Sequence, residues 1–219
     1  MEKNIYDISD RLLRRKEAQA MNWKYLYDPL SVFGKSRGLL IGTLVVVVLT
    51  LVAWWAGVHL DGALDLHINP KFPSILIVAM ESLVDWLSLA LVFFIGSKIL
   101  RGNGGLGAHL AGVGLARFPY ILASIIASRQ LLGKAMLAAV TIKPDTITVR
   151  PQDLLSPGLI IGSIVLMLMM IWSVAILYFG FKEASRLRGA KLVISFIIGI
   201  IIAEVISKAV IYGMIKMDF

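Results

Sequence analysis

The chain lacks cysteine altogether and has few acidic residues, with 14 Asp and Glu against 22 Lys and Arg among 219 residues. The absence of cysteine excludes disulfides, cysteine-ligated metal and thiol catalysis. The motifs H-E-x-x-H and G-x-S-x-G are also missing, which argues against a metalloprotease or a serine hydrolase. We therefore expect a protein that is not an enzyme and that needs no cofactor.

Beyond the N-terminal 38 residues, long polar segments are lacking too, because five apolar stretches occupy most of the chain. They lie near residues 39–58, 74–97, 108–128, 158–181 and 192–213. About 20 apolar residues cross the hydrocarbon layer of a bilayer, and a composition of 58% hydrophobic and 16% charged residues agrees. We expect an all-α, polytopic helical bundle with five transmembrane helices. A long charged segment precedes the first stretch, so we expect no cleavable signal peptide.

The net charge of +8 follows from membrane topology rather than from nucleic-acid binding. If successive spans cross the membrane in opposite directions, the connectors on one side carry fourteen basic residues and those on the other side carry six. The positive-inside rule then places the N-terminus in the cytoplasm and the C-terminus outside. The fourteen are the eight that precede the first span, with Lys98, Arg101, Lys182, Arg186, Arg188 and Lys191.

The third apolar stretch leaves two alternatives open. Apolar character continues from about Leu110 to Ile142, interrupted by Arg117, Arg129 and Lys134. One alternative is a single span followed by an interfacial helix. The other is a pair of short re-entrant pieces, which would reverse the sidedness of everything after it.

The N-terminal segment, residues 1–37, is expected to form a cytoplasmic unit separate from the membrane domain of residues 38–219. Ile5, Ile8, Leu12 and Leu13 share one helical face beside basic residues. Such an amphipathic helix can lie on the membrane surface, with basic groups facing anionic lipid. Docking of a cytosolic partner is the alternative.

The loop after the first span carries two histidines and two aspartates. A hairpin that turns at Gly62 to Leu64 would bring its polar side chains to one face. Imidazole and carboxylate groups arranged in this way bind divalent metals. The alternative is a loop that is merely polar and solvated. The candidate metal ligands are His59, Asp61, Asp65 and His67.

Three other local patterns predict turns. Residues 102–107 match G-x-G-x-x-G, but they follow an apolar span rather than a strand, so we interpret them as a flexible cytoplasmic turn. The alternation from Thr141 to Val149, with Pro144 and Asp145 at its centre, predicts a short β-hairpin. Ser156 and Pro157 predict the start of the fourth span.

Ionisable residues inside the spans are the main candidates for function. Two carboxylates four residues apart share one helical face, which is costly in a membrane unless a cation approaches. One interpretation is a buried polar cluster of Glu81, Asp85 and Arg117 that fixes helix packing, with a separate Glu204–Lys208 pair. The other is a pathway for an ion, a proton or a lipid headgroup. Because Glu81 and Asp85 share a helix, an intramembrane acid protease is disfavoured.

Several positions resemble the Yip domain family, the Ypt/Rab-interacting proteins. The resemblance is carried by the run from Trp172 to Ala184 with the following basic turn to Lys191, by Pro29 to Phe33, by the glycine-rich turn and by Phe118-Pro119. It extends over nearly the whole chain from about Asp28.

The resemblance implies a five-span helical bundle with a cytoplasmic N-terminus and brings no catalytic residues. Eukaryotic members work in early secretory traffic with Rab-type GTPases, and some prokaryotic members accompany ABC-type exporters. The short termini are more similar to the prokaryotic form. We therefore expect a scaffold or accessory subunit of a partner complex in the prokaryotic inner membrane. Gly112 and Ala116 would suit close helix contact, including contact in a homo-oligomer.

Overall fold

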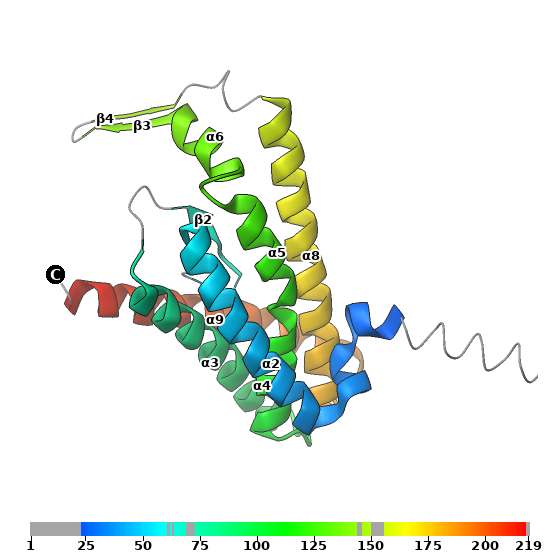
Figure 1. The fold of residues 1–219 in the computed structure, drawn as a ribbon. Helices are drawn as coiled ribbons and strands as arrows, with labels where there is room; N and C mark the ends of the chain where they lie inside the picture. Colours follow the sequence, from blue (N-terminus) through cyan, green and yellow to red (C-terminus); the bar gives the residue numbers. More distant parts are fainter. Residues whose placement is uncertain are drawn as a thin grey trace, which may run out of the picture.

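The structure is a computed structural model that describes residues 23–60, 62, 64–68, 73–143, 146–149 and 156–217, with side chains for all of these except 137–149, 215 and 217. Within these ranges, long helices form a bundle joined by short connectors (Figure 1). The predicted amphipathic helix falls mainly on residues 1–22, which lie outside the described residues, so it stays a prediction. Residues 23–27 are helical.

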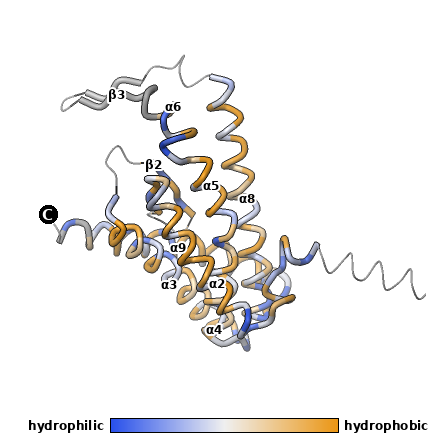
Figure 2. The backbone as a smooth tube through the Cα atoms, in the orientation of Figure 1, coloured by the Kyte–Doolittle hydropathy of each residue, from blue (hydrophilic) through white to orange (hydrophobic). Residues whose placement is uncertain are grey.

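Five helices are long and apolar enough to cross a membrane, which confirms the predicted fold class. Figure 2 shows hydrophobic residues along their lengths and hydrophilic ones gathered at the turns. The third span, residues 106–127, consists of two helices that meet at Arg117. The helices are α2 (Pro29–Ala56), α3 (Ile75–Ile99), α4 (Leu106–Ala116), α5 (Phe118–Ala127), α8 (Pro157–Ser185) and α9 (Gly189–Met217).

The short elements agree with the sequence predictions. The third apolar stretch forms one span followed by the short helix α6 (Leu132–Ala139). The predicted hairpin consists of β3 (Val140–Lys143) paired antiparallel with β4 (Thr146–Val149). A second pair, β1 (Val58–His59) with β2 (His67–Ile68), closes the loop between α2 and α3.

Polar residues begin the long helices where the sequence places them. The Asp28 side chain accepts a hydrogen bond from the Ser31 amide (3.4 Å), and Pro29 occupies the first turn of α2. The Ser74 hydroxyl accepts from the Ile77 amide (3.2 Å) and so caps α3. Ser156 is the N-cap of α8, as predicted, although its side chain makes no capping hydrogen bond. The Asp28 and Ser74 side chains thereby satisfy amides that have no partner within the helix.

Glycines let α4 pack closely between α2 and α8. A Cβ on Gly114 would lie 2.8 Å from the carbonyl carbon of Gly42, and one on Gly112 would lie 3.2 Å from the backbone of Gly180. Small residues at helix crossings are typical of membrane interiors, because close packing replaces the hydrophobic effect there. The close contact predicted at Gly112 therefore exists, but it is made within the chain. Ala116 is likewise buried.

The glycine-rich turn fits against the C-terminal end of α8. A Cβ on Gly104 would overlap the carbonyl oxygen of Ala184, and one on Gly102 would lie 2.7 Å from that of Ser185. The Gly102 amide donates to the Ser97 carbonyl (2.7 Å). The glycines are needed because two backbone segments meet there, and no dinucleotide-binding geometry is involved.

The last helix, α9, packs chiefly against α3 and runs beside it in Figure 1. The Phe93 ring lies 4.5 Å from that of Phe181 and 5.6 Å from that of Phe196. These rings belong to the largest buried apolar cluster, which extends through α3, α4, α8 and α9. Aromatic contacts of this kind join α9 to the bundle.

Candidate functional site

The candidate site is built around the loop of residues 57–68, called here the α2–α3 loop. Gly57 ends α2 with a φ of 70°, a left-handed conformation that glycine adopts readily. The chain then reverses through β1 and β2, which pair His59 with His67 as the sequence predicts. Leu60 is 1% exposed and packs with Leu49 and Val78. The loop therefore enters the bundle rather than lying over it.

Glu81 of α3 holds the first half of this loop. Its Oε2 accepts a hydrogen bond from the Leu60 amide (3.2 Å), and its Oε1 lies 2.8 Å from His59 Nδ1. Glu81 is 2% exposed, so both contacts are shielded from solvent. The sequence predicts a group of Glu81 with Asp85 and Arg117. In the structure its direct partners are in the loop.

Glu204 and Lys208 of α9 hold the second half. Lys208 Nζ lies 3.0 Å from Glu204 Oε1 and 2.8 Å from Asp65 Oδ2. Glu204 Oε2 also accepts from the Leu64 amide (3.1 Å). Gly62 leaves no room for a side chain, because a Cβ there would overlap the Glu204 carboxylate. The loop thus links α3 to α9 through two carboxylates.

Asp85 and Arg117 form a second, more deeply buried pair of charges. They are 1% and 4% exposed, and Arg117 is the strongest opposite charge acting on Asp85. Neither Asp85 oxygen has a hydrogen-bond partner among the described residues. The Ser207 hydroxyl faces Asp85 but donates to the Glu204 carbonyl (3.3 Å). No hydrogen bond joins the two side chains in the part of the chain that the structure describes, so the grouping of Asp85 with Arg117 stays a prediction.

Arg117 occupies the break between α4 and α5, where Pro119 lacks the amide that a continuous helix needs. The Tyr120 amide donates to the Arg117 carbonyl (3.1 Å), so the Ala116 carbonyl is released from the helix. The Ser173 hydroxyl of α8 donates to that carbonyl (2.6 Å). A neighbouring helix thereby satisfies the backbone at the kink, as a membrane interior requires.

Tyr120 connects the kink to the α2–α3 loop. Its hydroxyl donates to the Leu64 carbonyl (2.9 Å), and the Arg117 guanidinium lies 5.5 Å from its ring centre. Tyr120 was not among the residues predicted from the sequence, although its position three residues after Arg117 places the two on one helical face. Ser173 was missed as well, and only its depth in an apolar span could have indicated it.

His109 of α4 was also overlooked. It is 1% exposed, and its ring lies between Phe94 and Phe181, with centroids 5.8 and 6.1 Å away. Its Nδ1 lies 3.1 Å from the Gly105 carbonyl, while Nε2 has no partner among the described residues. A lone histidine in an apolar helix was the available signal. Its surroundings are aromatic and its location is distant from the loop, so it belongs to the packing of the glycine-rich turn.

The structure tests the predicted metal ligands only in part. The His59 and His67 rings stack with centroids 5.4 Å apart, while Asp65 contacts Lys208. Asp61 lies outside the described residues. Among the residues that are described, no group of three or more His, Asp or Glu side chains is arranged to hold a metal ion. The four-ligand site therefore stays a prediction.

The site consists of hydrogen bonds and ion pairs that hold the α2–α3 loop in place, rather than of an acid–base pair. Glu81 and Glu204 face backbone amides and cationic or imidazole groups, and the two residues come from different helices. Carboxylates that accept such hydrogen bonds fix the positions of the groups that donate to them. The arrangement positions a loop inside a membrane bundle.

Comparison with known proteins agrees with this architecture. The model of the Yip1 domain matches residues 23–210, which include the first four spans and most of the fifth. No curated protein and no solved structure matches the chain. Because the family model extends over most of the sequence, this multi-pass membrane protein belongs to the Yip1 domain family.

Proposed function

We propose that the protein is a non-enzymatic membrane scaffold, or an accessory subunit that organises a partner complex. The observation that supports this most is the use of Glu81 and Glu204 to hold the α2–α3 loop. Charged groups committed to loop amides and to Lys208 contribute to assembly instead of lining an open polar path. The partner class that fits best is another membrane complex, such as an ABC-type exporter or membrane-trafficking machinery.

The proposal includes an orientation in the inner membrane with residues 1–37 in the cytoplasm. Contacts of Gly102 and Gly104 with the end of α8, and of Gly107 with Lys35, gather the basic connectors at one end of the bundle. Such an end suits the cytoplasmic face under the positive-inside rule. The α2–α3 loop and the β3–β4 hairpin would then face outside.

The test is an affinity purification of the tagged protein from native membranes in mild detergent, with mass spectrometry of the proteins that co-purify. An unrelated five-span protein with the same tag is the control for background. Stoichiometric recovery of an exporter or of another membrane complex supports the proposal and identifies the partner. Recovery of the protein alone, at several detergent strengths and after cross-linking, would contradict it.

A small transporter or channel is the second candidate, and Asp85 and Arg117 are the reason. Both are buried in the spans, and the Asp85 oxygens and Arg117 Nη2 lack hydrogen-bond partners among the described residues. An ion or a lipid headgroup could use that free capacity. Flux into liposomes distinguishes the two functions. Loss of flux in folded Asp85→Asn protein would favour transport, and an absence of flux in the unmodified protein would exclude it.

A further inference from the structure

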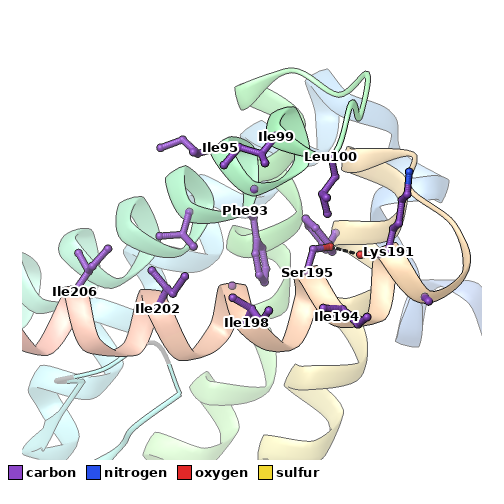
Figure 3. Close-up of a pocket in the computed structure, with 15 residues that line it drawn as sticks. Phe93, Ile95, Ile99, Leu100, Lys191, Ile194, Ser195, Ile198, Ile202 and Ile206 are labelled. Atoms are coloured by element: carbon purple, nitrogen blue, oxygen red, sulfur yellow. Dashed lines mark hydrogen bonds between the residues drawn. The ribbon is translucent and has the colours of Figure 1, made fainter.

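An apolar groove runs between α3 and α9 on the outside of the bundle. It encloses about 550 Å³, and Figure 3 shows isoleucines along both of its walls, among them Ile95 and Ile198. Phe93 reaches across it toward α9. The isoleucines are not buried, since Ile95 and Ile194 keep 54% and 56% of their surface exposed. The groove therefore opens toward the acyl chains of the bilayer.

The dimensions of the groove suit a single acyl chain. Its wall on α9 extends from Lys191 to Ile206, which is roughly 22 Å at 1.5 Å per residue. Half of the hydrocarbon layer is roughly 15 Å thick. A chain from one leaflet can therefore lie along the groove for its full depth, and the volume falls within the range of small-molecule sites.

One end of the groove is basic. Lys191 lines this end together with Leu100 (Figure 3), and the exposed Lys98 and Arg101 flank Leu100 in the chain. None of the described residues that line the groove is an Asp or a Glu. Lys191 takes part in none of the ion pairs made by the described residues. An apolar slot that ends in unneutralised positive charge matches a molecule with a hydrocarbon chain and an anionic head.

We propose that this groove binds one anionic glycerophospholipid. An acyl chain lies between the isoleucines of α3 and α9, and the phosphate headgroup contacts Lys191, with Lys98 and Arg101 nearby. Basic residues at the cytoplasmic membrane surface attract anionic headgroups. A second copy of the chain fits poorly, because a twofold contact would oppose this basic end to itself.

Bound lipid would strengthen the attachment of α9. That helix packs chiefly on α3, so a chain seated between the two adds contact on the open side of their interface. A ligand that binds only the folded protein stabilises it by RT ln(1 + L/Kd), where L is the free ligand concentration, so the free energy of unfolding rises with the lipid concentration. The proposal does not depend on the partner complex, since lipid binding is measured on the purified protein.

The test is native mass spectrometry of the full-length protein, titrated with phosphatidylglycerol or with phosphatidylcholine of the same acyl chains. We expect phosphatidylglycerol to bind about fivefold more tightly per basic residue engaged. Lys191→Gln should remove about that factor for phosphatidylglycerol and leave phosphatidylcholine binding unchanged. Lys191 is exposed, so this variant is expected to fold.

A second variant blocks the slot. Gly96 lines the groove, and a Cβ there would have no neighbour within 4 Å, so Gly96→Phe places its ring in the open space. This change should weaken binding of both lipids. The matched control is Gly158→Phe on α8, a helical glycine with equally open surroundings that does not line the groove. It should bind lipid as the unmodified protein does.

Three results would overturn the proposal. Equal affinity for the two lipids would show that Lys191 selects no headgroup. Undiminished binding by folded Gly96→Phe protein would place the lipid elsewhere. A dimer that Gly96→Phe dissociates and Gly158→Phe does not would assign the groove to a second copy of the chain.

Discussion

The interfaces of α4 and the interface between α3 and α9 are packed in opposite ways. Gly112 and Gly114 bring α4 against the backbones of α8 and α2, so even a methyl group at either position would press on backbone atoms. Between α3 and α9, bulky isoleucines stand apart and enclose an open groove. Apolar content alone therefore does not produce close packing in a membrane. Small residues at the crossing points produce it.

The α2–α3 loop connects the closely packed part of the bundle around α4 to the looser interface between α3 and α9. Glu81 and Glu204 connect it to α3 and α9, while Tyr120 connects it to α5. Hydrogen bonds therefore compensate for the looser apolar contact of α9. The comparison predicts that damage to the α4 interfaces disrupts the whole bundle, and that damage to the loop contacts releases α9 and the loop first.

The largest effect is expected from Gly114→Leu. The new side chain would collide with the Gly42 backbone, and backbone cannot move aside as a side chain can. Overpacking commonly costs about 1–3 kcal/mol, and we expect at least about 3 kcal/mol here. Thermal unfolding in detergent measures the loss. Gly96→Leu, in the open groove, is the matched control, and equal destabilisation of the two variants would refute the contrast between the interfaces.

Replacing Glu81 by alanine should have the next largest effect. The Leu60 amide and the His59 ring would lose their buried partner, and a buried unsatisfied group costs about 1–3 kcal/mol. Glu81→Gln keeps an acceptor for the amide and should cost less. Hydrogen exchange should show faster exchange at residues 58–60 in both variants. Unchanged exchange there would mean that the loop is held in place by other contacts.

The sequence predicted the spans well because length and hydropathy are local properties. The α2–α3 hairpin could also be predicted from the sequence, since the spacing around Gly62 determines that His59 faces His67. The hydrogen-bond partner of Glu81 could not be predicted from the sequence. It depends on how far the loop enters the bundle, which is set by contacts with residues distant in the sequence, such as Tyr120 and Glu204.

The kink in the third span likewise has one part that the local sequence predicts and one that it does not. Phe118-Pro119 predicts an irregularity, because proline cannot continue the hydrogen bonding of the helix. The residue that compensates, Ser173, lies 57 positions away from Ala116. Serines are frequent in this sequence, and nothing local distinguishes this one. Contacts across the bundle of this kind depend on the packing of the helices, which the local sequence does not determine.

Ser173→Ala is expected to have a smaller effect at the α4–α8 contact. The Ala116 carbonyl would lose its donor, and hydrogen bonds between membrane helices contribute about 0.6 kcal/mol on average and up to about 1.7 kcal/mol. The control is Ser195→Ala on α9, whose hydroxyl donates only to its own helix, to Lys191 (2.6 Å) and Leu192 (3.1 Å). Thermal unfolding should separate the two variants, and identical curves would argue against a role for Ser173 at the kink.

The smallest effect, and the one with the opposite sign, is expected from Gly96→Ala. In the helix interior, glycine is less favourable than alanine by about 0.5–1 kcal/mol. The added methyl group meets no atom within 4 Å, so no clash opposes this gain and the protein should become slightly more stable. Gly114→Ala carries the same gain in helix propensity, but its methyl group would meet the Gly42 backbone. If Gly96→Ala raises the unfolding midpoint and Gly114→Ala lowers it, the two variants differ because of the space available at each interface, since the chemical change is the same. A loss of stability in Gly96→Ala would mean that the groove is closed in the folded protein.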